Sequence, residues 1–273
     1  MNFPNLTPIV KNLLLINFVL FFADWTFSSS LHLDLGNYFG LHYVSASNFG
    51  IWQFITYMFM HSTLSHIVFN MLSLFIFGPL IENRLGMRRF VVYYLICGVG
   101  AGLLQQLTLF FEIKNFVSSV DTLLADPNTQ TITSFISGVG QPFSQESYIA
   151  WQGFVSEYNT LTQTSFADAQ ALARHFFIDY QQQYIDCHCM VGASGAIFGI
   201  LLAVGMLFPN LPLYIWFIPI PIKAKWFVCF YALFELIFGV ADFHYDNVAH
   251  WAHLGGMIFG FLLLYCWRKN SVL

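Results

Sequence analysis

The sequence predicts an all-α polytopic membrane protein, a bundle of six transmembrane helices, and two observations support this class. First, the 273 residues are 57% apolar and only 9% charged, with a mean hydropathy of +0.63, whereas soluble domains carry about 25% charged residues. So few charges cannot cover a globular surface, and much of it must face lipid. Second, six stretches approach the roughly 20 apolar residues that a spanning helix needs. They are roughly residues 9–27, 62–81, 90–111, 190–208, 226–241 and 247–267.

The first stretch contains Lys11 near its start and lacks a small-residue cleavage site. We therefore interpret it as a retained span rather than a signal peptide. Residues 28–52, which follow it, are aromatic and weakly charged, as is typical of a segment at the membrane interface. Residues 1–112 thus hold spans 1–3 and this interfacial loop.

Basic residues predict the orientation of the spans, because Lys and Arg gather in cytoplasmic loops. Eight of the ten lie near the N-terminus, between spans 2 and 3, between spans 4 and 5, or after span 6. They are Lys11, Arg84, Arg88, Arg89, Lys223, Lys225, Arg268 and Lys269. A chain that crosses six times places all of them on one side. We therefore expect both termini in the cytoplasm.

Residues 113–189 differ in composition from the spans around them. They hold two basic and seven acidic residues, many Gln, Ser and Thr, and are long for a connection between helices. Ser165 and Asp168 fit a capping box, and apolar residues then recur at helical spacing. These residues are Ala169, Leu172, Ala173, Phe176 and Phe177. We expect a small extracytoplasmic helical insert within one membrane domain formed by 1–112 and 190–273.

Charge and cysteine content argue against several classes of protein. A net charge of −4 offers no basic footprint for nucleic acid, and five scattered cysteines do not make a disulfide framework. Cys187 and Cys189 flank His188, which leaves a metal site open there, but no further ligand pair has suitable spacing. We expect neither a metal nor a cofactor.

Polar side chains inside spans are costly and are functional candidates for that reason. Four stand out: His66 and Asn70 on span 2, Ser194 on span 4 and His253 on span 6. These three spans all enter from the outside, and each residue follows the outer end by a few positions. At about 1.5 Å per residue all four lie very roughly 5–12 Å deep and can share one layer.

Ser194 follows Gly192 and Ala193 and precedes Gly195 and Ala196. Small neighbours let another backbone approach, and the N–H groups of a beginning helix favour a negative oxygen. A nucleophile needs both access and such donors. The alternative is a helix-packing seam of small residues. The stretch is not the Gly-x-Ser-x-Gly elbow of soluble hydrolases, because residue 196 is Ala.

His253 precedes a second seam, Gly256 and Gly260, on span 6. If this seam meets Gly195 and Gly199 of span 4, a hydrogen bond of ~3 Å between Ser194 and His253 is feasible. His250 lies nearer the interface, and we expect it to be solvated or structural.

Two further groups keep alternative interpretations. His66 and Asn70 are four residues apart and share one helix face, where they either stabilise an oxyanion or hydrogen-bond a neighbouring helix. Glu235 is the remaining buried acid of the spans. It either orients His253, as Asp does in soluble triads, or lines a wet cavity or binds a neighbouring helix.

Together these residues resemble the rhomboid family of intramembrane serine proteases. Three ordered motifs match, and Glu82–Gly86 looks like a further family feature. The motifs are His66–Asn70 (HIVFN), Gly192–Gly195 (GASG) and Ala252–Gly256 (AHLGG) with Gly260. The resemblance covers roughly residues 50–111 and 190–267.

The resemblance implies that Ser194 is the nucleophile and His253 the general base and acid of a dyad. His66 and Asn70 would stabilise the oxyanion together with the Ser194 backbone N–H, and Phe198 would pack on the catalytic imidazole. The substrates would be single-span membrane proteins cut in or near the lipid bilayer. The six-span layout of bacterial type indicates the plasma (inner) membrane.

This chain departs from the family pattern in two ways. The loop after span 1 has Trp52 but lacks the Arg that accompanies Trp in many members. The insert 113–189 is far longer than the usual connection; it caps the site, binds substrate or a partner, or has no functional role.

Three other classes of protein are less compatible with the sequence. An inactive relative would lack Ser194 or His253. A metalloenzyme using His61, His66, His250 and His253 would normally show His-Glu-x-x-His. A transporter predicts inverted repeats, and we find none in the sequence.

Overall fold

The computed structural model describes residues 6–138, 142–214, 221–241 and 248–270, and these are mostly helical. Each expected span corresponds to a helix, so the all-α polytopic class is confirmed. The helices are α1 (Pro8–Leu31), α4 (Leu64–Leu85), α5 (Met87–Ala125), α9 (Ser194–Leu207), α10 (Ala224–Ala241) and α11 (His250–Lys269). Residue 247, where the sixth span was expected to begin, lies outside the described residues.

The membrane-crossing capacity of these helices differs. Among the described residues, α1, α4, α5 and α10 are long and apolar enough to cross a membrane, and α9 is apolar but shorter. The expected span 190–208 begins as extended chain, and its helix has only 14 residues. The count of six spans therefore stays a prediction.

The chain forms two compact units. Unit 1 comprises Met1–His42, Asn48–Leu107 and Cys189–Leu273, and unit 2 comprises Tyr43–Ser47 and Thr108–His188. The long helix α5 contributes its first half to unit 1 and its second half to unit 2.

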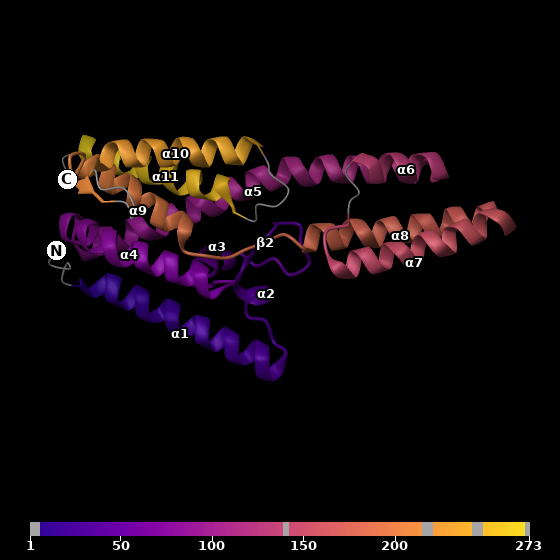
Figure 1. Ribbon diagram of the computed structural model, residues 1–273, viewed down its shortest axis with the longest axis horizontal. Coiled ribbons are helices and arrows are strands. Elements are labelled where there is room, and N and C mark those ends of the chain that lie inside the picture. Colours follow the sequence, from indigo (N-terminus) through magenta and orange to yellow (C-terminus); the bar gives the residue numbers. More distant parts are fainter. Residues whose placement is uncertain (1–5, 139–141, 215–220, 242–247, 271–273) are drawn as a thin grey trace. The chain divides into compact units, whose positions relative to one another are not determined.

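In unit 1, α9 packs against α4, α10 and α11 (Figure 1). Close approach is possible because glycines line the contact. A Cβ added to Gly256 of α11 would lie 1.8 Å from the carbonyl oxygen of Gly195, and one added to Gly199 of α9 would lie 3.1 Å from the carbonyl oxygen of Gly256. Such close van der Waals packing holds helices together in lipid, where apolar burial supplies no drive between them.

Glu82, near the end of α4, caps the start of α1. Its carboxylate accepts hydrogen bonds from the Thr7 hydroxyl and from the backbone N–H groups of Ile9 (3.1 Å) and Val10 (2.9 Å). The two backbone donors lie in the first turn of a helix, where N–H groups lack helical partners. Gly86 ends α4 at φ +80°, a conformation that favours glycine, and α5 begins at the next residue.

Short elements position the segment before Ser194. Strand β1 (Leu41–His42) pairs antiparallel with β2 (Cys189–Met190), and β3 (Pro212–Leu213) pairs with β4 (Ile222–Lys223). The loop expected at 28–52 contains the last turn of α1, helix α2 (Gly36–Phe39) and β1. Helix α3 (Gln53–Thr56) and a 3₁₀ turn, η1 (Tyr57–Phe59), lead to α4.

Unit 2 is a helical assembly around aromatic side chains. It contains the second half of α5, α6 (Thr129–Gly138), α7 (Gln145–Thr164) and α8 (Phe166–Asp186). The Ser165 hydroxyl accepts from the Asp168 N–H at the start of α8. On the expected inner face of this helix, Ala169, Ala173 and Phe177 are buried, and Leu172 and Phe176 are partly buried. The helical character of the insert is therefore confirmed. Its core includes Phe116, Phe135, Trp151, Phe154, Tyr158, Phe177 and Tyr180.

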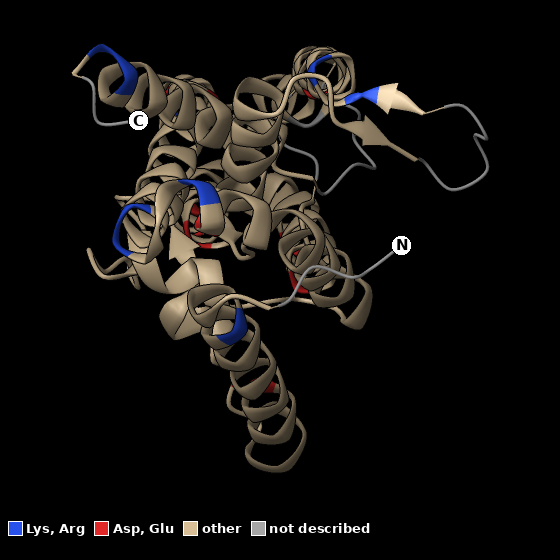
Figure 2. Cartoon of the chain, turned by 90° about the vertical axis from the view of Figure 1, so that its left-hand side faces the viewer, with Lys and Arg blue, Asp and Glu red and all other residues tan. Residues whose placement is uncertain are grey.

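Basic residues gather at one end of the helices of unit 1. Arg84 lies in the last turn of α4, Arg88 and Arg89 follow the start of α5, and α11 ends with a further basic pair. Figure 2 views the end where both chain termini are labelled, and blue segments lie on several separate helices there. The pattern agrees with the charge argument, and the cytoplasmic orientation itself stays a prediction.

Candidate active site

Ser194 and His253 lie next to each other in unit 1. Ser194 is the first residue of α9, and His253 lies in the first turn of α11. The His253 Nε2 is 2.8 Å from the Ser194 Oγ, and His253 is buried. The glycine contacts between α9 and α11 bring the two side chains within this distance.

Phe198 fixes the plane of the His253 ring from one side. It lies one turn after Ser194 on α9, and the two rings stack with centroids 4.0 Å apart and 7° between their planes. Tyr231 of α10 packs behind Phe198, with ring centroids 5.2 Å apart. An imidazole held in this way keeps its Nε2 directed at the serine.

Glu235 of α10 binds two histidines of α11. Its Oε2 lies 3.0 Å from His253 Nδ1 and 2.6 Å from His250 Nδ1. All three side chains are buried. Of the two alternatives for His250, the solvated one is wrong, because packing against α10 buries it beside the carboxylate, and a structural contact is what the structure has. The donor atoms of the three groups lie within 4.8 Å of one another, so they form the metal-compatible cluster found among the described residues.

His66 and Asn70 of α4 face the backbone just before Ser194. A Cβ added to Gly192 would lie 2.6 Å from His66 Nε2 and 3.6 Å from Asn70 Nδ2. Gly192 itself has φ +123°, where a side chain would be strained. Within the part of the chain that the structure describes, Asn70 Nδ2 is buried without a hydrogen-bond partner. Two polar side chains therefore lie beside Gly192, two residues before the serine, and the Asn70 amide nitrogen is unsatisfied.

Two further contributors to this geometry are Tyr57, which the sequence did not indicate, and His61, which it indicated only as a possible metalloenzyme ligand. The Tyr57 carbonyl accepts the Gly192 N–H at 2.9 Å, which fixes the glycine loop before Ser194. The His61 ring lies 5.0 Å from that of His66. A backbone carbonyl leaves no signal in a sequence, whereas the spacing of His61 and His66 could have indicated their proximity.

Two pockets formed by described residues are lined by neither Ser194 nor His253. One, of about 590 Å³ in unit 1, lies between α1 and the start of α4. It is lined by Phe21, Phe22, Asp24, Trp25, Ser28, His61, Ser62, Thr63 and Leu64. Its residue Ser62 lies 3.3 Å from His66 Nδ1, so this pocket borders the donor pair.

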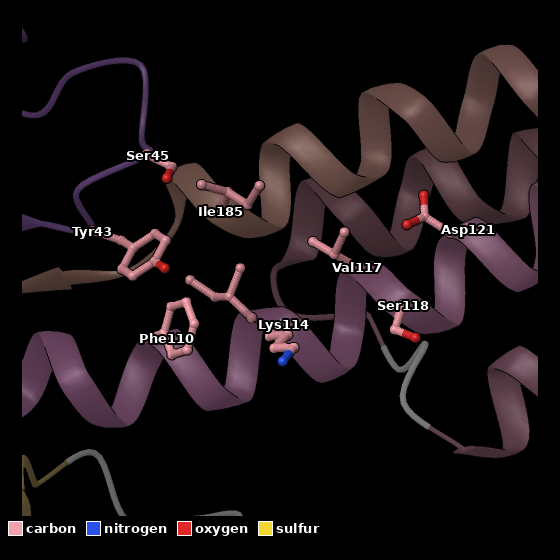
Figure 3. Close-up of a pocket in the computed structure, with 9 residues that line it drawn as sticks. Tyr43, Ser45, Phe110, Lys114, Val117, Ser118, Asp121 and Ile185 are labelled. Carbon is pink, nitrogen blue, oxygen red and sulfur yellow. The ribbon is translucent and has the colours of Figure 1, made fainter.

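The other pocket, of about 360 Å³, belongs to unit 2. Figure 3 shows Phe110, Lys114 and Val117 along α5, with Tyr43 and Ile185 facing that helix. It is an open hollow of mixed polarity, and none of the predicted site residues lines it.

Parts of the chain are similar to known proteins. A family model described as the rhomboid domain matches residues 48–112 and 159–270. Rhomboid protease AarA of Providencia stuartii is 32% identical over 106 residues, 38% of each chain. An uncharacterized mitochondrial rhomboid protein of Schizosaccharomyces pombe is 23% identical over 227 residues, 81% of this chain and 53% of that one. Rhomboid protease GlpG of Salmonella newport is 38% identical over 58 residues, 21% of each chain. The matches thus span about half or less of these relatives' lengths.

Proposed function

We propose that this chain, which belongs to the rhomboid family, is a serine endopeptidase that cleaves membrane proteins within the bilayer. The chain is an integral membrane protein, and its relatives include named proteases. The observation that carries the proposal is the 2.8 Å approach of His253 Nε2 to Ser194 Oγ.

In the proposed reaction, Ser194 Oγ attacks the scissile carbonyl carbon while His253 Nε2 takes its proton. The C–N bond then breaks, and His253 gives this proton to the leaving amine. Water attacks the acyl-enzyme with His253 again as base, which releases the carboxylic acid and restores Ser194. No metal or cofactor is required for these steps.

The oxyanion would form beside α4. The His66 side chain, the Asn70 amide and the backbone N–H of Ser194 supply donors there. With Ser62 donating to His66 Nδ1, the His66 Nε2 carries its hydrogen on the side of Gly192. Donors already oriented toward a developing negative charge are among the largest contributions to catalysis. An unsatisfied Asn70 amide fits this role better than it fits a purely structural one.

The proposed substrates are single-span membrane helices. A helix hides its scissile carbonyl in a backbone hydrogen bond, so it must unwind locally before attack. We expect a preference for helix-destabilising and small residues near the cut. A plasma-membrane location with cytoplasmic termini, and a role of residues 113–189 in binding substrate or a partner, are parts of this proposal.

Cleavage of a single-span substrate in detergent or liposomes tests the activity. Wild-type protein should cut it, and Ser194→Ala and His253→Ala should each reduce the rate by at least about 10³-fold. A variant that cleaves like wild type would refute the dyad. An Asn70→Ala variant should lower kcat about 10²-fold, with little change in KM.

A further inference from the structure

We infer that Glu235 is a positioning residue for His253 and that His250 holds Glu235 in place. The inference rests on the proposed function and extends the dyad by two residues that the family resemblance does not supply. Its basis is geometric: one carboxylate oxygen lies within hydrogen-bond distance of the Nδ1 atoms of both histidines.

The carboxylate selects the tautomer of His253. An ionised carboxylate only accepts hydrogen bonds, so His253 must carry its hydrogen on Nδ1 to bind Glu235. The Nε2 is then left with a free electron pair facing the Ser194 hydroxyl. This is the state that a general base needs before it takes the serine proton.

The charge of Glu235 also stabilises the state that follows. When His253 takes the proton it becomes an imidazolium, and a buried carboxylate 3.0 Å from its Nδ1 opposes that charge in a medium of low dielectric. The carboxylate needs donors of its own, since a buried charge is costly unless it is hydrogen-bonded. His250 supplies the second donor, at 2.6 Å.

The cluster of Glu235, His250 and His253 joins two helices and has other titratable side chains near it. Glu235 comes from α10, whereas both histidines lie three residues apart at the start of α11. Other titratable groups near this cluster are Tyr231 on α10, which interacts with Glu235, and His66 on α4, which interacts with His253. The competing explanation is that Glu235 merely ties α10 to α11.

Glu235→Gln separates the two explanations, because it keeps the shape and one acceptor oxygen and removes the charge. Positioning predicts a kcat lower by about 10²- to 10³-fold with KM nearly unchanged. The acidic limb of the pH–kcat profile should move to lower pH, because the imidazolium loses its counter-charge. Glu235→Asp should retain more activity than Glu235→Gln, and His250→Ala should lower kcat about 10-fold.

The matched control is Leu236→Ala on the same helix, since Leu236 is 44% exposed and should leave kcat unchanged. A second readout is the rate at which a fluorophosphonate labels Ser194, which needs no substrate docking. The labelling rate should fall in Glu235→Gln and, less strongly, in His250→Ala. If Glu235→Gln does not fold, the labelling rate of His250→Ala still tests the inference.

Wild-type kcat, pH profile and labelling rate in Glu235→Gln, with only a lower Tm, would overturn the inference and leave a structural tie. Loss of wild-type activity on chelation would overturn it as well, in favour of a metal bound by the cluster. Neither result decides the proposed function. Cleavage by the Ser194→Ala variant tests that function by itself.

Discussion

In unit 1 the helices meet at glycines, whereas in unit 2 they meet at aromatic rings. Gly256 of α11 lies against the backbone of Gly195 in α9. In unit 2, by contrast, Phe154 and Phe176 stack with centroids 4.2 Å apart, and Phe116 stacks on Tyr184 at 3.7 Å. Lipid gives apolar surfaces no reason to associate, so backbones must approach closely. In water, by contrast, the hydrophobic effect favours helices that pack by burying large aromatic rings.

Polar groups show the same difference. Unit 1 buries Glu82 and Glu235, and each accepts several hydrogen bonds. Most charged groups described in unit 2, such as Asp179, Glu112 and Arg174, are exposed, and Asp186 is partly buried. The comparison indicates that unit 1 places reactive polar groups in its interior. Unit 2 has an apolar aromatic core, as soluble domains do, and keeps most of its charged groups on the surface.

The largest expected effect is on the core of unit 2. Phe177→Ala removes a fully buried ring and should lower the local free energy of unfolding by about 3–5 kcal/mol. Hydrogen exchange across α7 and α8 measures this loss. Phe166→Ala, at a side chain 54% exposed on the same helix, is the control. Fluorophosphonate labelling of Ser194 should persist in both variants; its loss in Phe177→Ala would show that the serine site depends on the core of unit 2.

Gly256→Ala should be the next most damaging change. The added Cβ meets the Gly195 backbone, which cannot yield as a flexible side chain would. Helices α9 and α11 must then separate, and a shift of about 1 Å can lower kcat about 10²-fold. The matched control is Gly153→Ala on α7 in unit 2, where nothing lies within 4 Å of the new Cβ. Because Ala has a higher helix propensity than Gly, Gly153→Ala should stabilise α7 by up to about 1 kcal/mol. Equal effects of the two substitutions would remove the distinction between the units.

Deletion of residues 121–180 should change substrate choice more than catalysis. If unit 2 recognises substrates, the ratio of kcat/KM between two single-span substrates should shift about 10-fold, with hydrolysis of a generic peptide nearly unchanged. An unaltered ratio would leave these residues without a recognition role.

The smallest expected effect concerns pH and unit 2. Burial alone would lower the pKa of His188, but hydrogen bonds to Cys187 and Glu112 raise it to about 10. A raised pKa means that the stabilisation is complete below about 6.5 and is lost as the pH rises through 10. Between pH 7 and 10.5 the Tm of unit 2 should fall about 2–5 °C more in wild type than in His188→Gln. Parallel curves would show that the pair contributes nothing.

Apolar length and small-residue motifs predicted much of this fold, and they failed where packing decides. The apolar stretch 90–111 ends at residue 111, but helix α5 continues to Ala125. It continues because Phe116, Val120 and Leu123 pack in the core of unit 2. The run 190–208 predicted a full span. Pairing of β2 with β1 and the positive φ of Gly192 keep its first residues extended.

The candidate site was predictable to the same degree. Glycine seams on two helices indicated that Ser194 and His253 are close, and the structure has them 2.8 Å apart. The binding of His250 and His253 to a single oxygen of Glu235 could not be derived. No motif fixes the register of α10 against α11, because tertiary packing sets it.

Mass spectrometry of the protein after treatment with a fluorophosphonate in liposomes tests the central claim most directly. A covalent adduct on Ser194 in wild type, reduced at least about 10³-fold in His253→Ala, is the predicted result. Substrate cleavage by a protein that carries no adduct on Ser194, or equal labelling in His253→Ala, would contradict the account.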